Sequence, residues 1–282
     1  MLWRKMISGM AAFGAVALFV GAPMARTITV DDDGPADYSS IREAVEAASE
    51  GDTVLVKAGT YHEADIRMKN GTVLQGVGAD STIIVNDFLP KVMGTTFTVI
   101  FDEVSSAKID GFTISGPAEG TKWWEGQWER KPPSWWGIKR GICIYSCSPT
   151  IIHNKIINFA HGISILFDGS AMQPQPVIDG NTITNNIWAV EAYSRDVPWD
   201  SIDPWDIRWN WWGTTDESEI AATTVVSVPH IYSPWLTEPV TTFQQTPGIH
   251  YNNIYNNGFN FNRRPPEAVE GFSWGQVKRR FK

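Results

Sequence analysis

Cysteine is scarce in this sequence. Cys143 and Cys147 are the only two in 282 residues, too few for a disulfide scaffold. If "GICIYSC" is one extended strand, the two residues lie roughly 13 Å apart, beyond the reach of a disulfide. We therefore expect neither a bond between them nor a metal site built from the two alone.

Long apolar runs are absent after residue 25, so no segment beyond it is expected to span a membrane. The one long run, residues 6–20, follows Arg4 and Lys5 and precedes the small-residue stretch "GAPMA". This order is typical of a secretory signal. The sequence predicts a signal peptide over residues 1–25 and a secreted or periplasmic protein with no membrane partner after cleavage.

Positive charge is also in short supply. Without Arg4 and Lys5, 21 basic residues face 31 acidic ones, a net charge of −10. Such a surface argues against nucleic acid as the main partner. An acidic glycan that meets a local basic patch stays compatible with it.

Helical patterns are nearly missing. One segment, "YSSIREAVEAASEGD", has Ser40 three residues before Glu43, which is the spacing of a capping box, and Gly51 as a stop. We expect this helix, at residues 40–49, to cover the open N-terminal end of the fold and protect an exposed strand edge.

What fills the rest of the chain is a repeat of short apolar runs. "PTIIHNKI" (149–156) matches "PVIDGNTI" (176–183) without gaps, and "WDIRWNWW" (205–212) continues the series. A second series, "GICI", "GISI" and "AVEA", begins at residues 141, 162 and 189. Period-2 strands that recur every 20 to 40 residues indicate a solenoid with three strands in each rung.

The asparagines shared by the first series are expected to be structural: each sits at a bend that favours left-handed backbone angles, and their side chains stack.

The N-terminal stretch "DYSSIREAVEAASEGDTVLVKAGTYHEADIRMKNGTVLQGVGADSTIIV" resembles the pectin-lyase-like, right-handed parallel β-helix proteins. "NWWGTTDESEI" followed by "YSPWL" resembles a signature of exported β-helix repeat proteins of uncharacterised role. The resemblance implies an all-β, right-handed parallel β-helix with a short N-terminal capping helix. We place this domain at residues 26–262 and a C-terminal tail at 263–282. The fold itself is shared by enzymes and non-enzymes, so it fixes no activity.

Tryptophans gather in the insertions beside one strand of each rung. We name the "GISI" strand of a rung the first strand, the "TIIH" strand the second and the "KII" strand the third. The segment "KWWEGQWERKPPSWWG" (122–137) precedes a first strand, and "SRDVPWDSIDPW" (194–205) follows one. The sequence predicts a cleft on the first-strand face, in which flat aromatic rings contact sugar rings. The expected walls, with flanking residues at strand entrances and exits, are Trp123, Trp124, Trp128, Trp135, Trp136, Trp188, Trp199, Trp205, Arg195 and Tyr145.

Candidate catalytic residues face outward in the same strands. One hypothesis is β-elimination on an acidic polysaccharide, with Arg140 or Arg195 neutralising a carboxylate and His161 or a tyrosine such as Tyr193 taking the proton. The other is hydrolysis with Asp168 and Glu191 as acid and base. "HGISI" (161–165) is similar to the polygalacturonase active-site string, but the paired aspartates expected on preceding rungs are missing, and Arg140 stands at the equivalent position.

No cofactor is expected. "DDDG" (31–34) could suggest calcium, but it lacks a ligand loop and is expected to be an exposed turn. The predicted function is polysaccharide binding, with lyase or hydrolase activity open. The alternatives are a non-catalytic periplasmic assembly or maturation factor and a structural surface protein.

Overall fold

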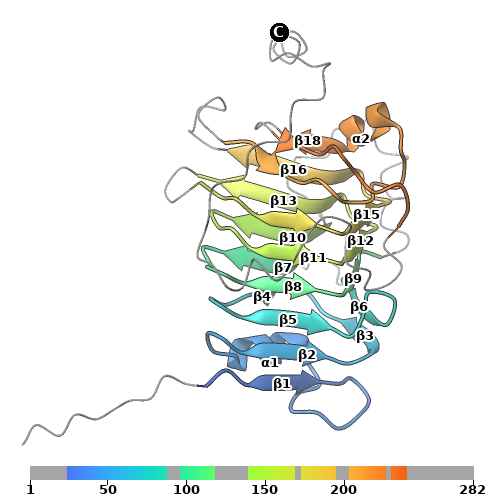
Figure 1. Cartoon of the computed structure of the whole chain (residues 1–282). Helices are drawn as coiled ribbons and strands as arrows, with labels where there is room; N and C mark the ends of the chain where they lie inside the picture. The colour runs from blue at the N-terminus through green and yellow to red at the C-terminus, as the bar shows by residue number, and fades with distance from the viewer. Residues whose placement is uncertain are drawn as a thin grey trace, which may run out of the picture. The chain divides into compact units, whose positions relative to one another are not determined.

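The structure is a computed structural model that describes residues 24–87, 96–117, 139–168, 173–194, 203–226 and 230–239 (Figure 1). The side chains of residues 193–194 and 225–226 are not among those described. All described residues belong to the first of two compact units, residues 1–244.

Three parallel sheets make up the fold (Figure 1). The second-strand sheet contains β1 (Thr27–Val30), β2 (Thr53–Val56), β5 (Val73–Gly76), β8 (Lys108–Asp110), β11 (Thr150–Ile152) and β14 (Val177–Asp179), in that order. The first-strand sheet contains β4 (Ile66–Arg67), β7 (Thr96–Asp102), β10 (Lys139–Tyr145), β13 (His161–Phe167), β16 (Trp188–Ser194) and β18 (Thr224–Val226). The third-strand sheet contains β3 (Gly59–His62), β6 (Thr82–Val85), β9 (Thr113–Ser115), β12 (Lys155–Ile157) and β15 (Thr182–Thr184). From β2 onward, consecutive strands of the chain lie in different sheets, and each rung stacks on the rung before it, as in a parallel β-helix.

The strand register confirms the alignment read from the repeats. Ile151 pairs with Ile178, and Ile163 pairs with Val190. These side chains point into the solenoid, where each is at most 1% exposed. Because β-branched side chains pack well on a pleated sheet, this inner column of isoleucine and valine supplies the core.

The repeated asparagines form a hydrogen-bonded ladder, as predicted. Asn181 Nδ2 donates to Asn210 Oδ1 at 3.0 Å, and Asn154 Nδ2 donates to Asn181 Oδ1 at 3.3 Å. The expectation that the asparagines themselves adopt left-handed angles is wrong. The residue before each one does so: His153 (φ 54°), Gly180 (φ 64°) and Trp209 (φ 60°) precede Asn154, Asn181 and Asn210. The left-handed residue makes the bend, and the asparagine then holds the bent backbone.

The N-terminal end is closed by α1 (Ile41–Ala47), which contacts β1, β2 and β4. Ser40 is its N-cap, and its hydroxyl accepts from the backbone N–H of Glu43. The sequence did not reveal Glu63, whose carboxylate accepts from the backbone N–H groups of Ile41 and Arg42. The free edge of β1 is occupied too, because Asp37 and Tyr38 both donate their backbone N–H to Thr29 O. The predicted cap is therefore present, and the loop before α1 also covers the edge of β1.

A second helix, α2 (Glu217–Thr223), was not predicted. It is seven residues long, and Ile220 is its only buried residue, so it has no periodic apolar face to recognise. Asp216 caps it by accepting from Ser218 N at 2.8 Å. After α2 the described chain adds β18, and β17 (Trp205–Asp206) pairs with β19 (His230–Ile231) in a small separate sheet.

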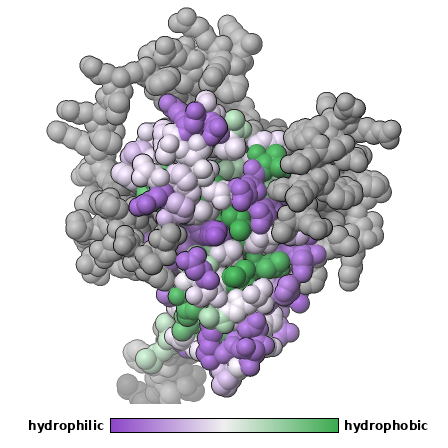
Figure 2. Space-filling view, turned by 90° about the vertical axis from the view of Figure 1, so that its right-hand side faces the viewer, coloured by the Kyte–Doolittle hydropathy of each residue, from purple (hydrophilic) through white to green (hydrophobic). Residues whose placement is uncertain are grey.

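The predicted boundaries of the signal peptide and of the C-terminal tail fall largely outside the described residues, which run from 24 to 239. Within the described ranges, no helix has the length and apolar character needed to cross a bilayer. The third-strand side of the molecule shows polar and apolar side chains interspersed (Figure 2).

Candidate functional site

The outer side of the first-strand sheet carries the residues that the sequence singled out. Arg140, His161 and Trp188 are paired in register on three successive strands, β10, β13 and β16. Cys143, Ser164 and Glu191 form the next outer column along the same strands. Neighbouring strands lie about 4.8 Å apart, so side chains from different rungs come within contact distance.

Arg140, His161 and Glu191 form one ion cluster. His161 Nδ1 lies 2.6 Å from Glu191 Oε2, and Arg140 Nη1 lies 3.3 Å from the same oxygen. Arg140 Nη1 also donates to Ser164 Oγ at 3.1 Å. The structure thus brings together three of the five predicted catalytic residues, each from a different rung.

The cluster is largely withdrawn from solvent: the side chains of Arg140, His161 and Glu191 are 15%, 3% and 24% exposed. Within the described part of the chain, four buried atoms of the cluster have no partner with hydrogen-bond geometry: Arg140 Nε, both ring nitrogens of His161, and Glu191 Oε2. Buried polar atoms in folded proteins are nearly always paired, so such exceptions call for an explanation. Here one unpaired donor and one nitrogen able to accept lie in the same cluster.

The electrostatics favour a neutral imidazole beside an ionised carboxylate. Burial lowers the pKa of His161, Arg140 lowers it further, and the contact with Glu191 only partly opposes this. Burial alone would raise the pKa of Glu191, but the contacts with His161 and Arg140 outweigh it, so that pKa lies below its usual range. A neutral His161 that holds its proton on Nδ1, toward Glu191, leaves the Nε2 lone pair available as a base.

Aromatic rings flank the cluster along the axis of the solenoid. The rings of His161 and Trp188 meet edge to face, with their centroids 4.6 Å apart. On the other side the guanidinium of Arg140 lies 5.9 Å from the centroid of the Phe97 ring. Trp188 is half-buried, as expected for a residue that could contact a ligand. Phe97 was not predicted as a site residue, although its register opposite Arg140 in β7 was the signal that could have revealed it.

Tyr145 and Asp168 form a second polar group at the exits of the first strands. Tyr145 Oη donates to Asp168 Oδ2 at 2.6 Å, and Ser146 Oγ donates to Asp168 Oδ1 at 3.2 Å. Glu191 instead contacts His161 and Arg140. The two carboxylates considered for hydrolysis therefore have separate sets of partners, and their described contacts do not unite them as an acid–base pair.

Several predicted site residues cannot be placed. Trp123, Trp124, Trp128, Trp135, Trp136, Arg195 and Trp199 lie outside the described residues, and of Tyr193 only the backbone is described, opposite Leu166. Trp205 is a correction: it is 1% exposed and belongs to the hydrophobic core, so it is not part of a cleft wall. Its place in β17, with Ile207 buried two residues later, turns its ring inward.

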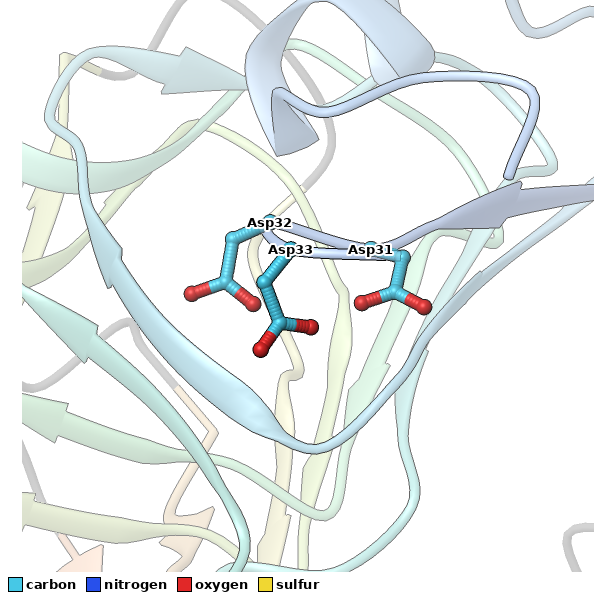
Figure 3. Close-up of side chains that lie close together, drawn as sticks. All are labelled: Asp31, Asp32 and Asp33. Atoms are coloured by element: carbon cyan, nitrogen blue, oxygen red, sulfur yellow. The ribbon is translucent and has the colours of Figure 1, made fainter. Parts of the chain in front are cut away.

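The three aspartates of "DDDG" lie close together, with one carboxylate oxygen from each within 4.8 Å of the others (Figure 3). Asp32 and Asp33 are exposed, as expected of a turn, but Asp31 is buried, and Lys57 Nζ lies 2.9 Å from its Oδ2. Asp32 accepts from the backbone N–H of Thr60. Lys57 and the backbone N–H of Thr60 thus already meet two of the three carboxylates.

Cys143 and Cys147 are both free and buried, as expected from their spacing. Burial raises the pKa of Cys143 to about 12 and that of Cys147 to about 11. A thiol that stays protonated is a poor nucleophile and a poor metal ligand, so neither cysteine joins the candidate site.

Comparison with known proteins adds little to this picture. No family model and no curated protein matches the sequence. Among solved structures, the chain is similar to a pectin methylesterase mutant in complex with a hexasaccharide, with 12% sequence identity and a TM-score of 0.37. The match covers 65% of this chain and 60% of that one, so the chain spans less than two thirds of its length. This similarity assigns no activity. The stacked parallel sheets themselves show that the chain is a parallel β-helix protein.

Proposed function

We propose that this protein is an exported polysaccharide-binding protein whose first-strand face acts on an acidic polysaccharide by β-elimination. The observation that carries the proposal is a buried cluster whose polar atoms, Arg140 Nε and His161 Nε2 among them, have no hydrogen-bond partner among the described residues. An anionic sugar would supply an acceptor for Arg140 Nε and a proton for His161 Nε2. Its carboxylate accepts a hydrogen bond from Arg140, and its acidic carbon presents a proton to His161.

The reaction needs only groups that this cluster holds. His161 Nε2 takes the proton from the carbon next to the carboxylate, and the electron pair of that C–H bond forms a carbon–carbon double bond. The glycosidic C–O bond breaks, and the leaving oxygen takes that proton from the imidazolium of His161, which restores the neutral ring. Arg140 stabilises the negative charge that grows on the carboxylate in the transition state. Glu191 keeps the proton of His161 on Nδ1 and stabilises the imidazolium that forms.

The other described residues fit a binding role. Trp188 is half-buried against His161, and a tryptophan face suits the apolar side of a sugar ring. Because His161 is 2% exposed, the ligand must open a path to it, and Trp188 lies where that path would begin. Hydrolysis by Asp168 and Glu191 is less well supported because Asp168 is held by Tyr145 and Ser146.

Product analysis tests the proposal. The chain without residues 1–25 is incubated with a panel of neutral and acidic polysaccharides, while the ultraviolet absorbance of unsaturated sugar ends and the number of new reducing ends are followed. We expect both signals to rise together with one acidic polysaccharide. Reducing ends without unsaturation would show hydrolysis and overturn the elimination step. Silence across the panel would contradict catalysis.

A further inference from the structure

A second cluster of charged side chains lies on a different face, the outer side of the second-strand sheet. Asp110, Ile152 and Asp179 occupy one column on β8, β11 and β14. They point away from the interior because their neighbours Ile109, Ile151 and Ile178 point into it. All three are nevertheless less than one-tenth exposed. Two carboxylates in such a place need compensation.

Asp110 has that compensation. Lys108 Nζ lies 2.9 Å from its Oδ2, and His153 Nδ1 lies 3.0 Å from its Oδ1. Burial alone would raise the pKa of Asp110, but the contacts with His153 and Lys108 outweigh it and hold the pKa below its usual range. This carboxyl therefore stabilises the fold in its ionised form.

Asp179 lacks it. Its Oδ1 is buried and has no hydrogen-bond partner among the described residues. The charged groups that face it are His153 at the turn after β11, and Asp206 and Arg208 from β17 and the turn that follows it. Arg208 is already engaged, because its Nε donates to Asp206 Oδ1 at 2.8 Å and its Nη2 contacts Asp206 Oδ2. Burial raises the pKa of Asp179 to about 6. His153, the backbone N–H of Gly180 and Arg208 only partly oppose the shift, and Asp206 adds to it.

We propose that this cluster binds a proton at Asp179, and that mildly acidic surroundings thereby stabilise the C-terminal rungs of the solenoid. A protonated Asp179 can stay buried at little cost and can donate a hydrogen bond, whereas an ionised one keeps a desolvated Oδ1 without a partner among the described residues. The cluster is independent of the first-strand site, so this inference and the proposed function can fail separately.

The direction of the pH dependence follows from linkage. A carboxyl whose pKa is higher in the folded than in the unfolded protein binds its proton more tightly when folded. The contribution of Asp179 to stability is therefore complete below the unfolded pKa of about 3.9 and is lost as the pH rises through about 6. Asp110, with its lowered pKa, contributes in the opposite direction.

Thermal unfolding of the full chain and of two matched variants tests the inference. Between about pH 4.5 and about pH 7.5, the Tm of Asp179→Asn should rise relative to that of the wild type by about 3–6 °C. Over the same range, Asp110→Asn should have a lower Tm than the wild type by a nearly constant amount, because Asp110, with its lowered pKa, is ionised and paired throughout. A Tm difference between Asp179→Asn and the wild type that does not change with pH, or that changes in the opposite direction, overturns the proposal.

A measurement on the wild type keeps the test decisive if a variant does not fold. The ¹³C chemical shift of the Asp179 side-chain carboxyl group is followed through a pH titration. A midpoint near 6 supports proton binding at Asp179. A midpoint at or below that of an ordinary aspartate, about 3.9, contradicts it.

Discussion

Replacing His161 by alanine is expected to lower turnover of the acidic polysaccharide by about 10²–10⁴-fold, the range contributed by a positioned general base. Nε2 of this ring is the proposed proton acceptor, and within the described ranges no other imidazole contacts Glu191. Glu191→Gln should lower turnover as well, because a neutral amide stabilises the imidazolium less. Steady-state kinetics on the substrate found by product analysis measure both effects.

The pH profile separates the role of Glu191 from mere structural support. Glu191 raises the pKa of His161, so its replacement by glutamine should move the acid limb of the turnover profile to lower pH. His62→Gln is the matched control, because His62 also pairs with a carboxylate, Asp87, at 2.8 Å but on the third-strand face and exposed. Full activity in His161→Ala, or equal losses in His62→Gln, would remove His161 from the mechanism.

Replacing Asn181 by alanine is expected to cost about 3 kcal/mol or more in the free energy of unfolding. Asn181 is fully buried. Its Nδ2 donates to Ile151 O at 2.9 Å, to Asp179 O at 3.1 Å and to Asn210 Oδ1. Its Oδ1 accepts from Asn154 N at 2.9 Å. Alanine would leave these buried groups without partners on three consecutive rungs.

Thermal unfolding measures this cost, and a Tm lower by about 6–12 °C is expected for a domain of this size. Gln175→Ala serves as control because it removes an exposed amide in the connection before β14, and its effect should stay within about 0.5 kcal/mol. If the two variants unfold at the same temperature, the ladder does not hold the rungs together.

The architecture could be predicted from the sequence because the repeat encodes it. Each rung reuses the same pattern of inward isoleucines and a bend asparagine, so aligning "PTIIHNKI" with "PVIDGNTI" already gave the strand register that Thr150 and Val177 show. The register in turn placed Arg140, His161 and Trp188 side by side. Because successive rungs pair in parallel, residues at equivalent positions of two neighbouring repeats lie next to each other in the sheet.

Contacts that break the repeat could not be predicted. The partner of Glu191 depends on how far Arg140 and His161 reach across neighbouring rungs, which alternation alone does not specify. Glu63 caps α1 although it lies more than 20 residues away in the sequence, and no local sequence pattern predicts this contact. Trp205 was predicted to lie in a cleft wall because it belongs to a tryptophan-containing insertion. Its burial depends instead on the pairing of β17 with β19.

The most direct test of the central claim is a calorimetric titration of the inactive His161→Ala variant with acidic and neutral oligosaccharides. We predict saturable binding of an acidic oligosaccharide, at least about tenfold weaker when Arg140→Gln is added, because a charge-assisted hydrogen bond is lost. Trp188→Ala in the same background should also weaken it. Binding that is as tight for neutral as for acidic sugars, or that is unchanged by Arg140→Gln and Trp188→Ala alike, would contradict an acidic-polysaccharide site on the first-strand face.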